Sequence, residues 1–210
     1  IKQFDWKLNI TLLYNEEKSG AKARNKWITH AEWEYIFFTD DDITFDKKYI
    51  ETAINFLDKN PSIQGITGKE LLSEKKPNYI GKLIWWLFCI STLSESSKIL
   101  RSWHNTSYSS CNEERFTQSI CWCSIIRKDI FNKITFHDNF IKRSFGEDVF
   151  LSHRIYKQYW KQSLKYLPQL KYKHFHSPEG RLANISLIRM KIIYRYIFWK
   201  TEVYDNNILN

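Results

Sequence analysis

The chain has 210 residues, a length that suits one domain with at most a small appendage. Apolar residues make up 43% of the chain and charged residues 26%, so it can bury a core, and this composition argues against an intrinsically disordered protein. The formal net charge of +9 favours a polyanionic partner, such as nucleic acid, an anionic membrane surface or a phosphorylated substrate, but does not choose among them.

The first third of the chain alternates between strand and helix patterns. The expected elements are a buried strand at 8–14, a helix at 19–31 with Ser19 as N-cap, a strand at 34–39, a helix at 47–59 capped by Asp46, and a strand at 63–67. Pro61 cannot continue a helix and therefore ends the second one. This alternation predicts an α/β layer with a largely parallel sheet.

The remaining two thirds of the chain give less regular signals. We expect a helix at 79–91, a mobile polar loop at 94–114, a strand at 119–126, a short helix at 128–134, an amphipathic helix at 147–160, two edge strands at 164–167 and 170–174, and a last helix at 182–200. Open α/β nucleotide-binding domains usually begin with a strand and a turn that grip the nucleotide. No such segment precedes residue 8, so we expect the first one or two βα units to be missing.

Two segments bear on membrane contact. The most apolar run, 83–90, is too short to span a bilayer, and a core helix is favoured over an interfacial patch. The segment 182–200 places Arg189, Lys191, Arg195 and Lys200 among apolar and aromatic residues. It suits a membrane interface, or alternatively a helix that packs on the core with a solvated basic edge.

The four cysteines do not imply a disulfide framework in a chain of this length. Free thiols in a reducing compartment are the default expectation, and no signal peptide is evident in the sequence. A cytoplasmic location therefore follows as the expectation, with peripheral contact at the inner face of the membrane.

An acidic triplet, Asp40-Asp41-Asp42, ends the apolar segment 35–39. Ligands bind at the carboxyl ends of strands in open α/β sheets, and adjacent carboxylates repel each other unless a cation offsets them. Mg²⁺ and Mn²⁺ prefer oxygen ligands and commonly join carboxylates to substrate phosphates. The triplet predicts such a metal site, and a solvated turn with an N-cap is the alternative.

Three further groups could serve the same site, and each has a structural alternative. Arg24 and Asn25 lie in the first helix, whose N-terminus attracts anions, although they could equally form a solvated basic face. Glu147 and Asp148 begin a helix, where one could accept a proton or both could simply be capping residues. His174 and His176 would face the same way in an extended segment and could complete a metal site or be structural.

The order of these motifs resembles that of the family 2 inverting glycosyltransferases with the GT-A fold. The matching segments are Ser19 to Asn25, Glu34 to Asp42, Cys123 to Phe131, Gly146 to Arg154, and His176 to Arg181. The resemblance covers about residues 8–181, and implies a Rossmann-like open mixed sheet flanked by helices. Residues 1–181 would be an N-terminally incomplete catalytic domain, and 182–210 a basic aromatic C-terminal helix.

The resemblance also implies roles for individual residues. Asp42 would bind Mn²⁺ or Mg²⁺ with His176 nearby, and Asp148 would be the base with Glu147 beside it. On the donor side, Asp40 and Asp41 would lie near the donor, and Arg24 and Asn25 would frame the nucleotide. Trp122 and Arg127 would lie on the acceptor side. The donor would be a nucleotide-diphosphate sugar, and the acceptor a saccharide or lipid-linked saccharide. The pair Trp122-Cys123 stands where small residues are common in the family, so the acceptor pocket would be narrower.

Two other classes of function compete with this interpretation. A catalytically silent binding module could keep the fold without transferring sugar, although such a protein has no need of costly carboxylate clusters. The positive charge alone would also suit a nucleic-acid-binding protein, but no motif that reads DNA or RNA is present, so we expect no nucleic-acid partner.

Overall fold

The computed structural model describes residues 9–17, 19–72, 79–88, 92, 97–100, 102–106, 111–120, 123–137, 140, 145–160, 162–175 and 184–204. The strands are β1 (Tyr35–Phe38), β2 (Ile43–Phe45), β3 (Gly65–Glu70), β4 (Arg115–Phe116), β5 (Ser124–Arg127) and β6 (Leu164–His174). The helices are α1 (Gly20–His30), α2 (Tyr49–Lys59), α3 (Tyr79–Leu87), α4 (Glu147–Tyr159) and α5 (Asn184–Phe198), with a 3₁₀ helix at Lys128–Asn132 and a π-helical turn at Trp199–Tyr204.

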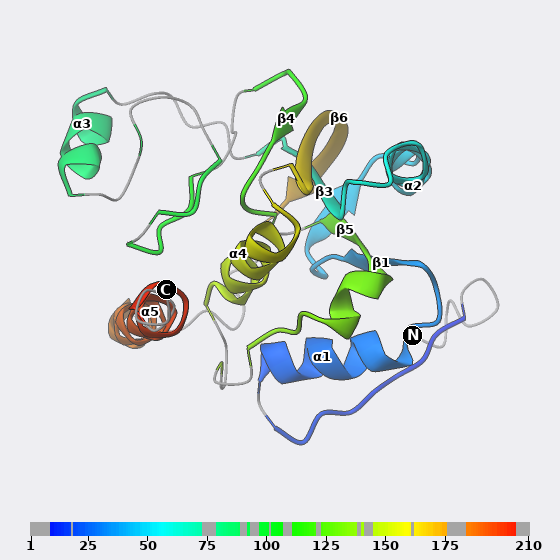
Figure 1. The fold of residues 1–210 in the computed structure, drawn as a ribbon, viewed down its shortest axis with the longest axis horizontal. Helices are drawn as coiled ribbons and strands as arrows, with labels where there is room; N and C mark the ends of the chain where they lie inside the picture. Colours follow the sequence, from blue (N-terminus) through cyan, green and yellow to red (C-terminus); the bar gives the residue numbers. More distant parts are fainter. Residues whose placement is uncertain are drawn as a thin grey trace.

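The six strands form one mixed sheet in the order β1-β5-β3-β6-β2, with β4 also paired to β6 (Figure 1). The predicted open mixed sheet flanked by helices is therefore confirmed. The expectation of a largely parallel sheet is wrong, because among the described strands only the β3–β6 ladder is parallel. Strand β5 runs antiparallel to both β1 and β3, which follow the helices α1 and α2.

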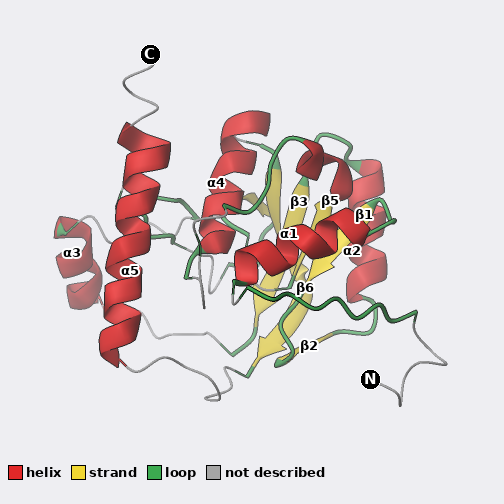
Figure 2. Ribbon diagram, turned by 90° about the horizontal axis from the view of Figure 1, so that it is seen from below, coloured by secondary structure: helices red, strands yellow, loops and turns green. Residues whose placement is uncertain are grey.

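Helices cover both faces of the sheet, and each face carries its own apolar cluster. Alternation along a strand sends neighbouring residues to opposite faces. Thus Ile125 of β5 packs in a cluster with Ala53 and Leu57 of α2, whereas Ile126 packs in the cluster that contains α1, α4 and Phe198 of α5. Figure 2 shows the sheet between these helices. This arrangement leaves the ends of the strands free to form a site.

Helix α1 begins as the sequence predicts. The Ser19 hydroxyl accepts a hydrogen bond from the Lys22 backbone N–H at 3.2 Å, which satisfies one of the unpaired donors of the first turn. Helix α2 differs, because it begins at Tyr49 and no side chain caps it. Asp46 contributes its backbone carbonyl to the Tyr49 N–H instead of a side-chain cap.

Two strand predictions were wrong. Residues 9–14 form no regular structure and are mostly exposed, because no described strand pairs with them to bury their apolar side chains. The segments 164–167 and 170–174 form one long strand, β6, which lies inside the sheet and not at its edge. Its interruption in the sequence is Pro168, which cannot donate to a ladder, and the β3–β6 register shifts opposite it, between Thr67 and Lys69.

The apolar segment around α3 does not form a core helix as expected. Every described large apolar side chain from Ile80 to Phe88 is exposed, with exposed fractions from 45% to 76%.

The predicted loop at 94–114 is only partly described, and it contributes to the core: Trp103 is 4% exposed and stacks on Phe198 with ring centroids 5.6 Å apart. None of the helices in the described part of the chain has the length and hydropathy to cross a membrane.

Candidate functional site

The acidic triplet lies in the turn that follows β1 and leads to β2, the strands at the two ends of the strand order. The sequence did not predict β2, a three-residue strand that pairs antiparallel with the end of β6 and sets Ile43 opposite His174. The Phe175 N–H donates to the Asp42 carbonyl at 3.0 Å and extends this pairing. This pairing of β2 with β6 brings His174 next to the acidic triplet.

Asp40, Asp42 and His174 together form a group that could hold a metal ion. The His174 Nε2 lies 3.0 Å from the Asp42 Oδ1, and one potential ligand atom from each of the three residues lies within 4.8 Å of the others. Two carboxylates and one imidazole suit Mn²⁺, which accepts nitrogen as well as oxygen ligands, better than Mg²⁺, which prefers oxygen alone. Asp41 is exposed and is not part of this group.

The environment of Asp40 disfavours its ionised form. Burial is the largest effect and raises the pKa of Asp40, the Arg24 guanidinium lowers it, and the carboxylates of Asp42 and Glu147 raise it. A cation placed among these carboxylates would favour their ionised forms. The donor chemistry of the three residues is therefore compatible with a bound divalent ion.

The second acidic group lies at the start of α4. Glu147 is buried and pairs with the Arg24 guanidinium of α1, with 2.5 Å between its Oε1 and the Arg24 Nη1. Asp148, which follows it, has a pKa raised to about 7, because burial and the neighbouring Glu147 carboxylate both disfavour its ionised form. A carboxyl group with a pKa near neutrality is suited to accept a proton from a hydroxyl at physiological pH.

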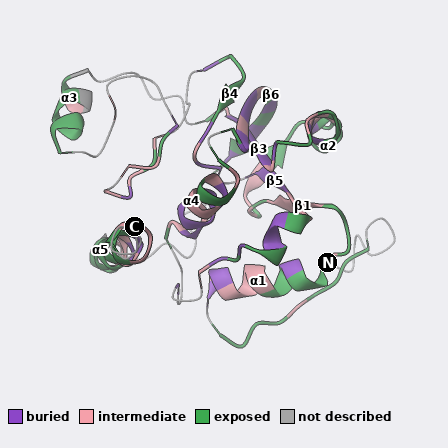
Figure 3. Cartoon of the chain, viewed as in Figure 1, coloured by how far each residue is buried: buried purple, intermediate pink, exposed green. Residues whose placement is uncertain are grey.

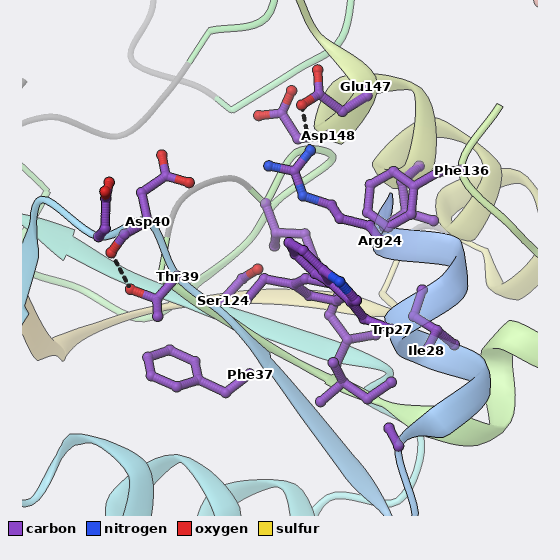
Figure 4. Close-up of a pocket in the computed structure, with 17 residues that line it drawn as sticks. Arg24, Trp27, Ile28, Phe37, Thr39, Asp40, Ser124, Phe136, Glu147 and Asp148 are labelled. Carbon is purple, nitrogen blue, oxygen red and sulfur yellow. Dashed lines mark hydrogen bonds and ion pairs between the residues drawn. The ribbon is translucent and has the colours of Figure 1, made fainter. Parts of the chain in front are cut away.

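A cavity of about 510 Å³ is lined by Asp40 of the first acidic group and by both residues of the second. Its wall includes Asp40 and Asp41 at the end of β1, Glu147 and Asp148 at the start of α4, and Arg24 of α1. Figure 4 shows Asp40, Arg24, Glu147 and Asp148 on different elements around one opening, with Trp27 and Phe136 on the side of α1. The cavity can hold a small ligand between a metal-binding group and a candidate base.

Gly146, which precedes α4, is required by the backbone at this position. Its φ is +82°, in the left-handed region, and a Cβ there would lie 2.4 Å from the Trp103 Cζ2. Trp103 in turn contacts Phe150 of α4, with ring centroids 5.9 Å apart. The buried indole therefore fixes the start of the helix that carries Glu147 and Asp148.

We expect Gly146→Ala to lower the free energy of unfolding by about 2–4 kcal/mol, because alanine is strained at this φ and its methyl group overlaps Trp103. Urea unfolding followed by tryptophan fluorescence measures this loss. Gly65→Ala is the matched control, since its methyl group would meet only side-chain ends at 3.1 Å. An equal or larger loss in the control would contradict the role assigned to Gly146.

The remaining predicted site residues are placed differently. The Asn25 side chain donates to the Phe136 carbonyl and accepts from the Phe136 N–H, both at 2.9 Å, so it anchors this segment to α1. Arg127 pairs with Tyr35 across the β1–β5 ladder, at the end of β1 opposite to Asp40, and donates to the Ile63 carbonyl at 2.9 Å. The antiparallel direction of β5 thus takes Arg127 away from the cavity. Trp122 and His176 lie outside the described residues.

Some residues of the cavity were not predicted from the sequence. Trp27 of α1 and Ser124 of β5 both line it, and Ser124 lies there because it pairs with Phe38 at the end of β1. Only the antiparallel register brings Ser124 to this position, so no pattern in the sequence could have identified it. Trp27 lies one helical turn after Arg24, and this spacing was the available signal.

The chain is similar to known proteins in sequence and in fold. The sequence model of the family described as Glycosyl transferase family 2 matches residues 1–135, more than half of the chain. The crystal structure of GalNAc-T7 with UDP, GalNAc and Mn²⁺ is 12% identical, with a TM-score of 0.65, and the match covers 96% of this chain and 38% of that one. The crystal structure of S. aureus TarS 1–349 with UDP-GlcNAc is 13% identical, with a TM-score of 0.53, and the match covers 93% of this chain and 52% of that one.

Because of their low identity, these two structures establish the fold alone. The chain spans about half of the TarS fragment and less of GalNAc-T7. No curated protein sequence matches the chain.

Proposed function

The chain belongs to glycosyltransferase family 2, and we propose that it moves a sugar from a nucleoside-diphosphate sugar to a hydroxyl acceptor with inversion of the anomeric centre. The observation that carries this proposal is one cavity lined by Asp40, which belongs to the group Asp40–Asp42–His174, and by the carboxylates of Glu147 and Asp148. One group suits a metal-bound diphosphate and the other suits proton transfer.

Asp148 is the proposed base. Its carboxylate accepts the proton of the acceptor hydroxyl while the acceptor oxygen bonds to the anomeric carbon and the bond to the diphosphate oxygen breaks. A single displacement of this kind inverts the configuration and needs no nucleophile from the protein. The Arg24–Glu147 ion pair supports this role, because it holds the start of α4 against α1 and its guanidinium charge limits the rise in the pKa of Asp148.

Asp42 and His174 are the proposed metal ligands, with Asp40 completing the group. The 3.0 Å contact between His174 and Asp42 holds both side chains at the edge of the sheet, before any substrate binds. A divalent ion bound there would offset the negative charge that develops on the departing nucleoside diphosphate. Mn²⁺ is the ion that we expect to work best, and Mg²⁺ the second choice, on the grounds of the imidazole ligand.

The substrates are inferred from chemistry and from the two structural neighbours. The UDP, UDP-GlcNAc and Mn²⁺ named for GalNAc-T7 and TarS support a uridine-diphosphate sugar as the first donor to test. The acceptor is proposed to be a hydroxyl of a saccharide or a lipid-linked saccharide. A reducing, cytoplasmic location is supported by the free thiols of Cys111 and Cys123.

Incubation of the chain with a panel of nucleotide-sugars and Mn²⁺ tests the proposal. We expect release of nucleoside diphosphate from one donor class, measured by a coupled assay, and loss of this release when EDTA removes the metal. Metal-dependent binding of a nucleotide-sugar without release or transfer would favour a silent binding module instead. Release that EDTA leaves unchanged would contradict the metal-dependent mechanism.

A further inference from the structure

Helix α3 presents an unusual surface, because its C-terminal half is a consecutive apolar run that is nevertheless exposed. Six side chains lie outside the core although they are consecutive, so they point in every direction around the helix: Leu83, Ile84, Trp85, Trp86, Leu87 and Phe88. A helix of this composition is normally buried in a protein core or in lipid. In Figure 1, α3 lies apart from the sheet, so the described part of the fold does not cover it.

Helix α5 has two opposite apolar faces, of which only one contacts the core. Tyr194 and Phe198 are buried, with the Tyr194 ring 4.5 Å from that of Phe140. At about 100° per residue, Ile185, Ile188, Ile192 and Tyr196 fall within a sector of about 80° on the opposite side. All four are exposed, with exposed fractions from 56% to 67%. The core therefore accounts for one face and leaves a continuous apolar stripe on the other.

Positive charge borders this stripe on both sides. The same helical geometry places Arg189 along one edge and Lys191 and Arg195 along the other, and Lys200 follows in the π-helical turn after α5. Arg189 and Lys200 are exposed, and neither α3 nor α5 contains an aspartate or a glutamate. Both helices lie on the side of the molecule away from α2, and Figure 3 shows exposed residues on their outer surfaces.

From these observations we infer that α3 and the exposed face of α5 form one lipid-binding surface, which docks on the headgroup region of an anionic phospholipid bilayer. Amphipathic helices with basic borders lie in the plane of the interface, bury apolar side chains among the headgroups and attract anionic lipids. Trp85, Trp86, Tyr196 and Trp199 supply the amphipathic rings that favour this depth.

The charges favour lipid over a second copy of the chain as the occupant. A symmetric dimer through this surface would place the cations of one α5 against those of the other, with no acidic residue on either helix to offset them. A bilayer of anionic lipid neutralises these cations and covers the apolar stripe at the same time. Docking in this way would bring a lipid-linked acceptor close to the protein.

Flotation of the chain with lipid vesicles tests the inference and requires no sugar transfer, so it is decided independently of the proposed activity. We expect binding to vesicles of phosphatidylcholine with phosphatidylglycerol, weaker binding at high salt, and little binding to phosphatidylcholine alone. The double variant Ile188→Glu, Ile192→Glu on α5 and the variant Trp85→Glu on α3 should each weaken binding at least about tenfold.

Trp33→Glu is the matched control, because Trp33 is also an exposed tryptophan but lies between α1 and β1, outside this surface. It should bind anionic vesicles as the unaltered chain does, and thermal melts check that every variant remains folded. Three results would overturn the inference: no binding to anionic vesicles, equal loss in the control, or a dimer in solution that the α5 double variant dissociates while vesicle binding is unaffected.

Discussion

Asp148→Asn is expected to slow sugar transfer by about 10²–10⁴-fold, the range that a positioned general base contributes. Asparagine keeps the shape of the side chain but cannot take up a proton from the acceptor hydroxyl. Donor and metal binding should change little, because Asp148 is not among the residues of the metal-binding group. Steady-state rates with saturating nucleotide-sugar, together with titration of the donor by calorimetry, separate these two effects.

The same carboxyl group sets the expected pH dependence. The pKa of Asp148 is raised to about 7, and only its ionised form can accept a proton. The ratio kcat/KM should therefore fall about tenfold for each pH unit below 7 and level off above it. Residual activity in Asp148→Asn should lack this acidic limb. If the limb persists unchanged in the variant, another group is the base.

A stability measurement controls for loss of folding. The folded-state pKa of Asp148 lies above the ordinary aspartate value of 3.8, so the folded state binds the proton more tightly and loses stability as the pH rises from about 4 through 7. Asparagine does not ionise in this range, so the variant does not lose this stability as the pH rises. The variant should be more stable than the unaltered chain at pH 8, by on the order of 1–3 kcal/mol, and equally stable near pH 4. Lower stability at pH 8 would contradict this account.

The parts of the fold that depend on local patterns could be predicted from the sequence. Helix α1 follows its Ser19 cap, and α4 follows the apolar periodicity of its residues, so both begin where the sequence indicates. Strand direction depends on pairing between distant segments, which no local pattern encodes. For this reason the prediction of a largely parallel sheet was wrong, strand β2 was not predicted, and β6 was predicted as two strands on either side of Pro168.

The candidate site shows the same division. The acidic groups were identified because carboxylates at a strand end and at a helix start are visible in the sequence. Ser124 and Arg127 illustrate what was not visible: they lie three residues apart in β5, and only the antiparallel register assigns Ser124 to the cavity and Arg127 to the far end. Likewise, the pairing of β2 with β6 decides that His174 lies beside Asp42.

Asp42→Asn is expected to weaken Mn²⁺ binding by at least about 100-fold. Loss of a residue that merely orients a ligand already costs about 10–100-fold in metal affinity, and loss of the ligand itself should cost no less. Sugar transfer at moderate Mn²⁺ concentration should fall in parallel, because the diphosphate would then leave without the ion's positive charge. The signal of free Mn²⁺ in electron paramagnetic resonance measures binding directly and independently of activity.

Asp41→Asn is the matched control for Mn²⁺ binding, because Asp41 belongs to the same triplet and carries the same charge but lies outside the three-residue group. Its Mn²⁺ affinity should stay within about threefold of the unaltered chain, since only long-range charge is lost. Equal weakening in both variants would mean that the triplet attracts the ion by its total charge and not by coordination.

The histidine ligand can be tested in the same way. The β2–β6 pairing favours His174, whereas the family resemblance favoured His176. If His174 is the ligand, His174→Gln should weaken Mn²⁺ binding about 10–100-fold and His176→Gln should not. The reverse result would show that the 3.0 Å contact between His174 and Asp42 only orients the carboxylate, and that the ion is bound by the carboxylates together with the histidine that follows β6.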